Sequence, residues 1–321
     1  MLYLLPALAV LILAAVIFAA NFLINTSIRR QPPLPPHDPA TLSPFWLDYV
    51  AKNNAAIAEL DTLPHEELTL SAHDGIRLFA RFFPAEGDGS THDTVIVVHG
   101  YRSGTGDFAM MLPWYRRQGF NCLVVENRAH GKSEGDFFGF GALDSRDCAA
   151  WCRLIADRIP GRAIFLHGIS MGAATVTLAA CHDLPPQVRG VIADCGYTSA
   201  VEEFRHVMRT SMHIPGPIAD LLMPVASLLC RLRAGYFFGE ASPLRAMPSA
   251  RLPFLFVHGG KDNYVPTEMG HRLYAACPTE KTLLIVDEAT HGVSYAIDPA
   301  AYEAAMTAFY APLRSDSGEM S

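Results

Sequence analysis

The stretch "FLHGISMGAATVTLAA", residues 165–180, places one serine, Ser170, between Gly168 and Gly172. A short apolar run comes before this serine, and small apolar residues without a helix breaker follow it. This pattern predicts a buried strand, a sharp turn and a tightly packed helix. The spacing G-x-S-x-G in such a setting is typical of a nucleophile elbow, which exposes a serine hydroxyl at a helix N-terminus. We therefore predict that Ser170 is a nucleophile, although the motif alone also occurs in ordinary turns.

The composition limits the class of protein. The chain has 321 residues, of which 50% are hydrophobic, and this is enough for one large α/β domain or two small ones. A net charge of −7 supplies no basic surface for nucleic acid, so no nucleic-acid partner is expected. The seven cysteines are scattered without metal-binding spacing, which favours buried free thiols and a reducing compartment.

The N-terminal segment, residues 1–28, contains no charged side chain and is long enough to cross a bilayer as one helix. A cleaved signal peptide and a buried core helix are the alternatives. The signal peptide is disfavoured because the segment lacks a basic start, its apolar run is too long, and no clear A-x-A cleavage site follows it. Arg29 and Arg30 follow directly, so the positive-inside rule predicts a single-pass membrane protein with its domain on the cytoplasmic side.

Residues 29–44 contain the stretch "QPPLPPHDP" (31–39), which is too rich in proline for a helix or a sheet. Such a composition is typical of an extended, semi-rigid spacer. We expect this spacer to hold the remaining domain, residues 45–321, a little away from the membrane.

Strand and helix patterns alternate along this domain. A helix is expected over residues 44–60, followed by the hairpin strands "ELTLSA" and "IRLFARFF" joined at Asp74-Gly75. Later apolar runs predict buried strands separated by helices near 108–118, 142–159, 267–276 and 299–310. This order predicts an α/β fold with a mostly parallel sheet covered by helices on both faces. The strand runs are "TVIVVHG", "NCLVVENR", the run before Ser170, "GVIADCG", "LPFLFVHGG" and "KTLLIVDEA".

The segment from about 197 to 250 does not fit the alternation. Three prolines interrupt its apolar middle, "IPGPIADLLMPVASLLCRLRAGYFF", and the charge-free part is too short to cross a membrane. We predict a helical cap insertion over the sheet edge. Its apolar side chains are expected to face partly inward over Ser170, which would favour an acyl chain as ligand. The alternative is that they only seal the cap onto the core.

A serine hydroxyl needs a histidine base and an orienting carboxylate, and in this architecture they follow in the order Ser, Asp or Glu, His. Asp262 comes directly after the strand "FLFVHGG", and His291 follows the last strand. These two are the predicted catalytic partners of Ser170. Asp194 also ends a strand and is the rival for Asp262. Asp287 and Glu288 are interpreted as surface charges at a strand end.

An oxyanion hole would use the backbone N–H of the residue after the nucleophile and one from the loop after an earlier strand. Met171 is the first candidate. Tyr101, after the strand that ends at His99-Gly100, is the second. Four histidines precede glycines at strand ends, but they lie on separate strands without paired spacing. We therefore expect structural hydrogen bonds from them, with no metal ion and no cofactor. They are His99, His130, His167 and His258.

Several motifs in order carry a family resemblance: "VIVVHGYRSG", "VVENRAHGKSEG", "GISMG", "SPLRAM", "FLFVHGGKDNYVP" and "ATHG". Residues 67–312 resemble the serine-hydrolase branch of the α/β-hydrolase superfamily, including its small esterases and its prolyl-peptidase-like and acyl-aminopeptidase-like relatives. Two positions depart from the pattern. The family usually has aspartate at Glu126 and glycine at Ala129, and these two positions shape one loop near the site. A serine at position 170, where other branches have aspartate, argues against dehalogenases and epoxide hydrolases.

The resemblance and the residues together predict a membrane-anchored serine hydrolase that cleaves a small-molecule or lipid-like carboxylic ester through an acyl-enzyme. A peptidase or amidase and a thioesterase of the same fold are alternatives. Ester cleavage is favoured over peptide cleavage because the sequence shows no pair of acidic residues that would bind the free amino terminus of a peptide. A non-catalytic relative that binds a ligand is the alternative from another class, and the full set of Ser170, Asp262 and His291 argues against it.

Overall fold

The computed structural model describes residues 4–32, 41–85 and 92–314, and it contains an eight-stranded sheet. The strand order is β1-β2-β4-β3-β5-β6-β7-β8. β1 and β2 form the predicted antiparallel hairpin, β2 also pairs antiparallel with β4, and all later neighbours pair in parallel. The bounds are β1 Glu66–Ser71, β2 Arg77–Phe83, β3 Thr94–Val98, β4 Asn121–Glu126, β5 Ile164–Ile169, β6 Val188–Asp194, β7 Phe254–Gly259 and β8 Lys281–Val286.

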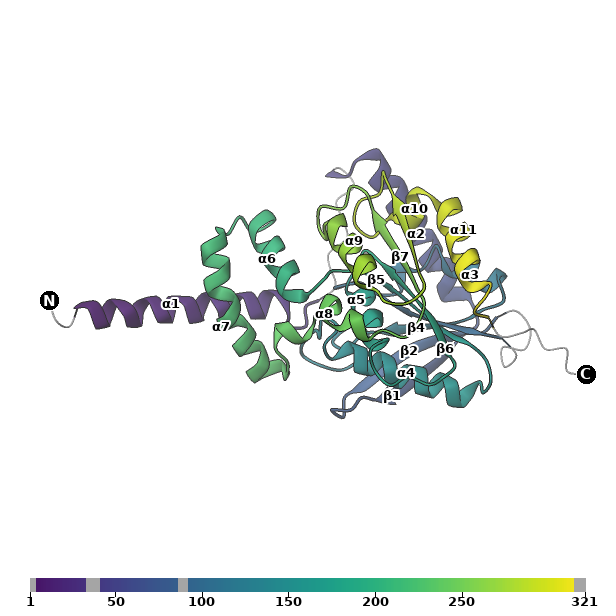
Figure 1. The fold of residues 1–321 in the computed structure, drawn as a ribbon, viewed down its shortest axis with the longest axis horizontal. Coiled ribbons are helices and arrows are strands. Elements are labelled where there is room, and N and C mark those ends of the chain that lie inside the picture. Colours follow the sequence, from purple (N-terminus) through teal and green to yellow (C-terminus); the bar gives the residue numbers. More distant parts are fainter. Residues whose placement is uncertain (1–3, 33–40, 86–91, 315–321) are drawn as a thin grey trace, which may run out of the picture.

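Helices cover both faces of this sheet, as predicted (Figure 1). One face packs on the helices α4, α5, α8 and α9, and the other packs on α2, α3 and α11. β3 and β5 are buried along their whole length, because a parallel strand between two helical layers has no solvent face. The bounds are α2 Pro44–Thr62, α3 Leu112–Arg117, α4 Asp144–Arg158, α5 Met171–Ala179, α8 Pro243–Ala246, α9 Thr267–Ala276, α10 Ser294–Ile297 and α11 Pro299–Tyr310.

Two helices, α6 (Ala200–Thr210) and α7 (Gly216–Ala234), form most of the insertion between β6 and β7. The expectation that three prolines interrupt this segment is wrong for Pro224, which lies inside α7. Proline inside a helix removes one backbone hydrogen bond. Here buried side chains on both sides of it, Met223 and Ala226 among them, anchor the helix across that position.

The N-terminal helix α1 (Leu4–Ser27) projects from the molecule and packs its C-terminal part against α7 (Figure 1). Ala20, Ile24 and Ile28 are buried in one cluster with cap residues. The amide of Phe138 donates to the Ile28 carbonyl at 2.8 Å, and the amide of Arg30 donates to the Asp136 carbonyl at 2.7 Å. The end of α1 and the residues directly after it therefore contact the domain. Residues 33–40 of the expected spacer lie outside the described residues.

All seven cysteines are free, and six of them are buried. This agrees with the interpretation of buried thiols.

Candidate active site

The turn between β5 and α5 is strained in the way a nucleophile elbow requires. Ser170 has φ 57° and ψ −115°, in a region that non-glycine residues rarely adopt. A Cβ on Gly168 would lie 2.1 Å from the Gly172 carbonyl oxygen, and a Cβ on Gly172 would lie 1.8 Å from the Val98 oxygen. Both flanking glycines are therefore required, because the turn packs directly on itself and on β3. This explains the sequence motif physically.

The structure brings the three predicted side chains together at the carboxyl ends of β5, β7 and β8. Ser170 Oγ lies 2.9 Å from His291 Nε2, and His291 Nδ1 lies 2.7 Å from Asp262 Oδ2. The other carboxylate oxygen of Asp262 accepts hydrogen bonds from the amides of Tyr264 and Val265. The three side chains form one continuous hydrogen-bonded chain whose carboxylate is fixed by its own loop.

The electrostatic surroundings keep Asp262 ionised. Burial by itself would raise the pKa of this carboxyl, but hydrogen bonds from His258 and His291 lower it to about 2. The contact with His258 is the longer of the two, with 3.4 Å between His258 Nε2 and Asp262 Oδ2 against 2.7 Å for His291. An ionised Asp262 fixes the ring of His291 and favours a proton on Nδ1, which leaves Nε2 free to accept one from Ser170.

Asp194, the rival carboxylate, lies at the end of β6, and its side chain binds a tyrosine. Its Oδ2 accepts a hydrogen bond from the Tyr302 hydroxyl at 2.9 Å. Burial raises its pKa to about 6. Its backbone oxygen accepts from the Ser170 amide at 2.8 Å, so this residue supports the elbow through its main chain.

The predicted oxyanion donors lie beside Ser170. Met171 is the first residue of α5, where backbone N–H groups have no partner within the helix. The loop after β3 passes so close that a Cβ on Gly100 would lie 3.4 Å from the Ser170 Cβ. Tyr101 follows Gly100, and its ring hydroxyl donates to the Ser27 carbonyl at the end of α1, at 2.7 Å.

The four histidines at strand ends make structural hydrogen bonds, as expected. His99 Nε2 accepts from the Asn127 amide, and His130 Nε2 accepts from the Arg102 amide. His167 contacts the Tyr115 and Tyr302 hydroxyls, and His258 contacts the Val265 carbonyl. Burial lowers the pKa of His99 to about 4 and that of His130 to about 3, so both rings are neutral.

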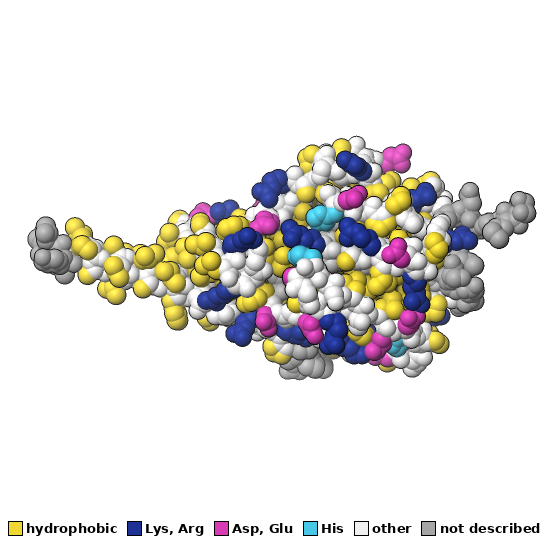
Figure 2. Space-filling model, turned by 90° about the horizontal axis from the view of Figure 1, so that it is seen from below, with side chains coloured by type: hydrophobic (Ala, Val, Ile, Leu, Met, Phe, Trp, Pro, Cys, Tyr) yellow, Lys and Arg dark blue, Asp and Glu magenta, His cyan; other side chains and the backbone are white. Residues whose placement is uncertain are grey.

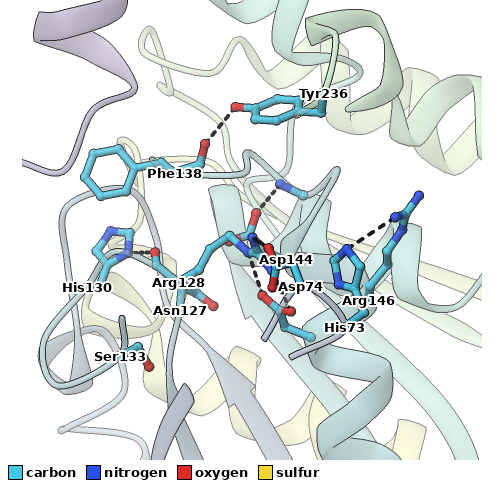
Figure 3. A network of polar contacts seen from close by, with 12 residues as sticks. His73, Asp74, Asn127, Arg128, His130, Ser133, Phe138, Asp144, Arg146 and Tyr236 are labelled. Atoms are coloured by element: carbon cyan, nitrogen blue, oxygen red, sulfur yellow. Dashed lines mark hydrogen bonds and ion pairs between the residues drawn. The ribbon is translucent and has the colours of Figure 1, made fainter. Parts of the chain in front are cut away.

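The two departures from the family pattern lie at the end of β4, where Glu126 is the last residue, and in the loop after it, which contains Ala129. Ala129 has φ 62°, a conformation that favours glycine, so the alanine keeps a strained turn. Arg128 fixes this loop by binding both carboxylate oxygens of Asp147, at 2.7 and 2.8 Å, and Asp74 at 3.0 Å. Figure 3 shows the loop continuing to Phe138, whose carbonyl accepts from the Tyr236 hydroxyl of the cap.

Two acidic residues near the site carried no sequence signal. Asp107 accepts the Gly100 amide at 2.7 Å and the Ser103 hydroxyl, and so holds the loop that bears Tyr101. Glu203 on α6 is buried, and neither of its carboxylate oxygens has a hydrogen-bond partner among the described residues. Burial, and next the charge of Asp262, raise the pKa of Glu203 to about 8. The positions of Asp107 and Glu203 near the site could not be predicted from the sequence, because the residues around them come from distant segments.

Cys195 completes a group with Asp262 and His291 whose ligand atoms lie within 4.8 Å of one another. Burial raises the pKa of the Cys195 thiol well above its usual range. A thiol that stays protonated is a poor metal ligand. The short contacts of His291 to Asp262 and Ser170 fit proton transfer better than metal ligation.

The raised pKa of Glu203 gives a pH-dependent prediction. The usual pKa of this carboxyl is 4.5, so between about pH 4.5 and pH 8 Glu203 is ionised in the unfolded chain and must take up a proton on folding. The free-energy cost of this proton uptake grows as the pH rises through that range. Glu203→Gln has no such cost. We expect the stability of the variant relative to wild type to increase by roughly 1–3 kcal/mol between pH 5.5 and pH 9, measured by thermal or denaturant unfolding. An equal difference at both pH values would contradict a raised pKa.

A doubly covered sheet of this strand order, with a strained serine turn after β5 and a histidine after β8, defines an α/β-hydrolase fold. Residues 89–234 match the family described as "Serine aminopeptidase, S33". Among curated proteins, the chain is 29% identical over 206 residues to the uncharacterized protein YqkD of Bacillus subtilis, covering 64% of this chain and 67% of that protein. It is 28% identical over 240 residues to an uncharacterized membrane protein of Saccharomyces cerevisiae, covering 74% and 76%.

Solved structures agree on the fold. An esterase of Pyrococcus furiosus superposes with a TM-score of 0.63 at 20% identity, over 80% of this chain and 95% of that chain. The acylaminoacyl peptidase of Pyrococcus horikoshii superposes with a TM-score of 0.57 at 16% identity, over 82% of this chain and 44% of that chain. The protein therefore has the α/β-hydrolase fold, and its structural neighbours include an esterase and an acylaminoacyl peptidase.

Proposed function

We propose that this protein is a serine hydrolase, anchored to a membrane by α1, that cleaves a carboxylic ester. The single observation that carries the proposal is the hydrogen-bonded chain from Ser170 Oγ through His291 to Asp262, at 2.9 and 2.7 Å. These distances are within the range of a nucleophile, its base and the group that orients the base. The strained elbow supports the same role for Ser170.

The proposed reaction has two halves. Ser170 Oγ attacks the ester carbonyl while His291 Nε2 takes the hydroxyl proton, and the N–H groups of Met171 and Tyr101 stabilise the oxyanion. His291 then gives its proton to the leaving alcohol, and the acyl group remains on Ser170. A water molecule, deprotonated by His291, attacks this acyl-enzyme, and the acid is released as His291 returns the proton to Ser170. The ionised Asp262 stabilises the imidazolium in both halves. No cofactor or metal ion is required.

One observation favours a second candidate, a peptidase for substrates with a free amino terminus. The buried carboxyl of Glu203, on the cap and close enough to Asp262 to be influenced by its charge, has no hydrogen-bond partner in the described part of the chain. The ammonium group of a substrate would be a suitable partner for this carboxyl. Ester cleavage remains the first proposal, because a carboxyl with a pKa of about 8 is mostly uncharged at neutral pH and the cap around it is largely apolar.

A substrate panel on the purified protein separates these activities. We expect p-nitrophenyl esters to be cleaved faster than a thioester or an aminoacyl p-nitroanilide, with kcat/KM rising from acetate to a medium chain length, because each buried methylene adds up to about 0.8 kcal/mol. Preferred cleavage of the aminoacyl amide, lost in Glu203→Gln, would establish the peptidase instead. A wild-type protein that neither turns over any of these substrates nor reacts with a fluorophosphonate would be a non-catalytic relative.

The membrane part of the proposal rests on α1. Residues Leu5–Ser27 form an apolar helix long enough to cross a bilayer, and one curated relative is named a membrane protein. Arg29 and Arg30 follow the helix, so we propose that the domain lies on the cytoplasmic side. Protease added to intact cells should then leave the domain whole and digest it only after lysis. Digestion in intact cells would reverse this orientation.

A further inference from the structure

The cap helix α7 has an apolar face that points away from the protein. Ile218, Leu221, Leu228 and Leu232 are exposed by 49%, 55%, 52% and 73%, and Val225 between them is half-buried. These five positions follow one another at intervals of three and four residues, so they lie on one side of the helix. We call them the outer stripe.

Apart from Val225, which packs partly on the buried cluster, the outer stripe does not attach the cap to the protein. A different face of α7, which includes Leu222, Ala226 and Cys230, is buried in one cluster with Ala20 and Ile24 of α1. The apolar side chains of α7 therefore face inward only in part, as the sequence analysis expected. An isolated exposed leucine is ordinary, but a continuous apolar stripe on a surface helix indicates an interaction surface.

The outer stripe continues the apolar surface of α1. In Figure 1, α7 crosses α1 at a steep angle close to the main domain, and the N-terminal part of α1 extends beyond it. Figure 2 shows hydrophobic side chains along the projecting helix and on the cap beside it, whereas most charged side chains lie on the broader part of the molecule. The exposed apolar residues of α1 include Leu8, Leu11, Phe18 and Phe22.

The length of α1 sets the depth of the cap. The helix Leu4–Ser27 has 24 residues, and its fully buried contacts with the cap begin at Ala20, after partly buried contacts at Val16 and Ala19. Its residues before Ala20 extend about 24 Å at 1.5 Å per residue, which is less than the roughly 30 Å hydrocarbon core of a bilayer. If this helix crosses the bilayer, its contact with α7 lies about 6 Å inside the hydrocarbon boundary. A helix lying across α1 at that depth is an interfacial helix.

The charges around this junction fit the same placement. Arg233 approaches the Asn25 side chain, with 3.5 Å between Nη1 and Oδ1, so α7 carries a cation level with the last turn of α1. Arg231 and Arg233 are exposed, and Arg29 follows the end of α1. The one acidic residue of α7, Asp220, pairs with Arg205 at 2.9 Å. Basic side chains at this level suit the phosphate groups of lipids.

The candidate active site is linked to this junction. The Tyr101 hydroxyl donates to the Ser27 carbonyl, and the Tyr101 ring packs on Phe140 with centroids 5.4 Å apart. Phe140 packs on Phe204 at 4.7 Å, and Phe204 lines an apolar cavity of about 50 Å³ between α1, α6 and α7. Met208, Met212 and Met223 also line this cavity, and methionine side chains adapt readily to an apolar ligand.

We propose that the cap is immersed in one leaflet of the bilayer, with the outer stripe of α7 among the acyl chains, and that Ser170 receives an amphiphilic ester from that leaflet. The acyl chain of this substrate enters between α1, α6 and α7, and its ester group reaches Ser170 past Tyr101. The substrate part rests on the proposed hydrolase function. The position of the cap does not.

Depth measurements on the full chain test the position of the cap. Nitroxide labels are placed on Leu221→Cys and Leu228→Cys in a Cys181→Ser background, because Cys181 is the one native cysteine that is not buried. The protein is reconstituted in vesicles of phosphatidylcholine and phosphatidylglycerol. We expect both labels to collide more often with oxygen than with a water-soluble nickel chelate, as acyl-chain positions do. A label on Glu268→Cys, exposed on α9, should show the reverse. Labels at 221 and 228 that behave like 268, or that neither reagent reaches because a second protein covers them, would overturn the proposal.

A kinetic comparison tests the route of the substrate. The double variant Leu221→Asp/Leu228→Asp should lose about tenfold or more of its activity on a long-chain ester held in vesicles, because the charged stripe resists immersion. Its activity on p-nitrophenyl acetate in detergent should be unchanged. Leu47→Asp, an exposed leucine on α2, is the matched control and should behave like wild type. Equal loss on both substrates, or no loss on either, would overturn delivery from the leaflet. A wild type that cleaves neither ester while its labels lie deep would refute the hydrolase proposal and leave the cap in the membrane.

Discussion

Replacing Ser170 with alanine is expected to lower kcat/KM for an activated ester by about 10³-fold or more while the protein still folds. The hydroxyl is the proposed nucleophile, and no other hydroxyl or thiol of the described residues takes part in the hydrogen bonds that join His291 to Asp262. Cys195 cannot replace it readily, because burial keeps its thiol protonated. The measurement is initial-rate hydrolysis of a p-nitrophenyl ester, together with fluorophosphonate labelling of both proteins.

The fold should survive this change because alanine keeps the Cβ of serine and the backbone at φ 57° already carries the strain. Thermal unfolding of the variant is therefore expected to match wild type within a few degrees. A folded variant that keeps its activity, or that still reacts with the fluorophosphonate, would show that Ser170 is not the nucleophile.

Asp262→Asn is expected to lower turnover by roughly 10²- to 10⁴-fold. The neutral side-chain amide introduced by this substitution cannot stabilise the imidazolium of His291. Its NH₂ group favours the His291 tautomer without a proton on Nδ1, which is the wrong one for accepting a proton from Ser170. Asp194→Asn is the matched control, since Asp194 ends β6, Asp262 lies in the loop after the neighbouring strand β7, and both carboxyls are buried. The amide oxygen that this control substitution introduces can still accept from the Tyr302 hydroxyl, so we expect less than about a tenfold effect.

Turnover numbers for the two variants, with circular dichroism as a check of folding, decide between the carboxyls. If Asp194→Asn were the more damaging change while both variants were folded, the orienting role would belong to Asp194.

Much of the fold could be predicted because its signals are local. The apolar runs of β3 and β5 are continuous because both faces of each strand are buried, and the glycines around Ser170 are there because a Cβ would collide with the backbone. The order of Ser170, Asp262 and His291 along the chain reflects the order of strands, so the sequence could also place these residues at strand ends. It could not choose between Asp262 and Asp194 by distance, since both follow strands.

The departures arise where distant segments meet. Pro224 lies inside α7 because contacts with α1 and the core hold that helix on both sides of the proline. The outer stripe and the buried face of α7 have similar apolar composition, and only the position of α1 decides which of them is covered. Glu203 has an ordinary place on a polar-looking helix, and its raised pKa exists only because the folded cap removes it from water near Asp262.

The sequence by itself determined the strand and helix order, the serine turn and the apolar N-terminal segment, because each depends on residues that are neighbours in the chain. Only the tertiary structure decided that Asp262 rather than Asp194 contacts His291, that the Tyr101 side chain joins the end of α1, and that α7 leaves one apolar face uncovered. These features depend on distances between segments that lie far apart in the sequence, which packing of the whole chain sets and no local pattern records.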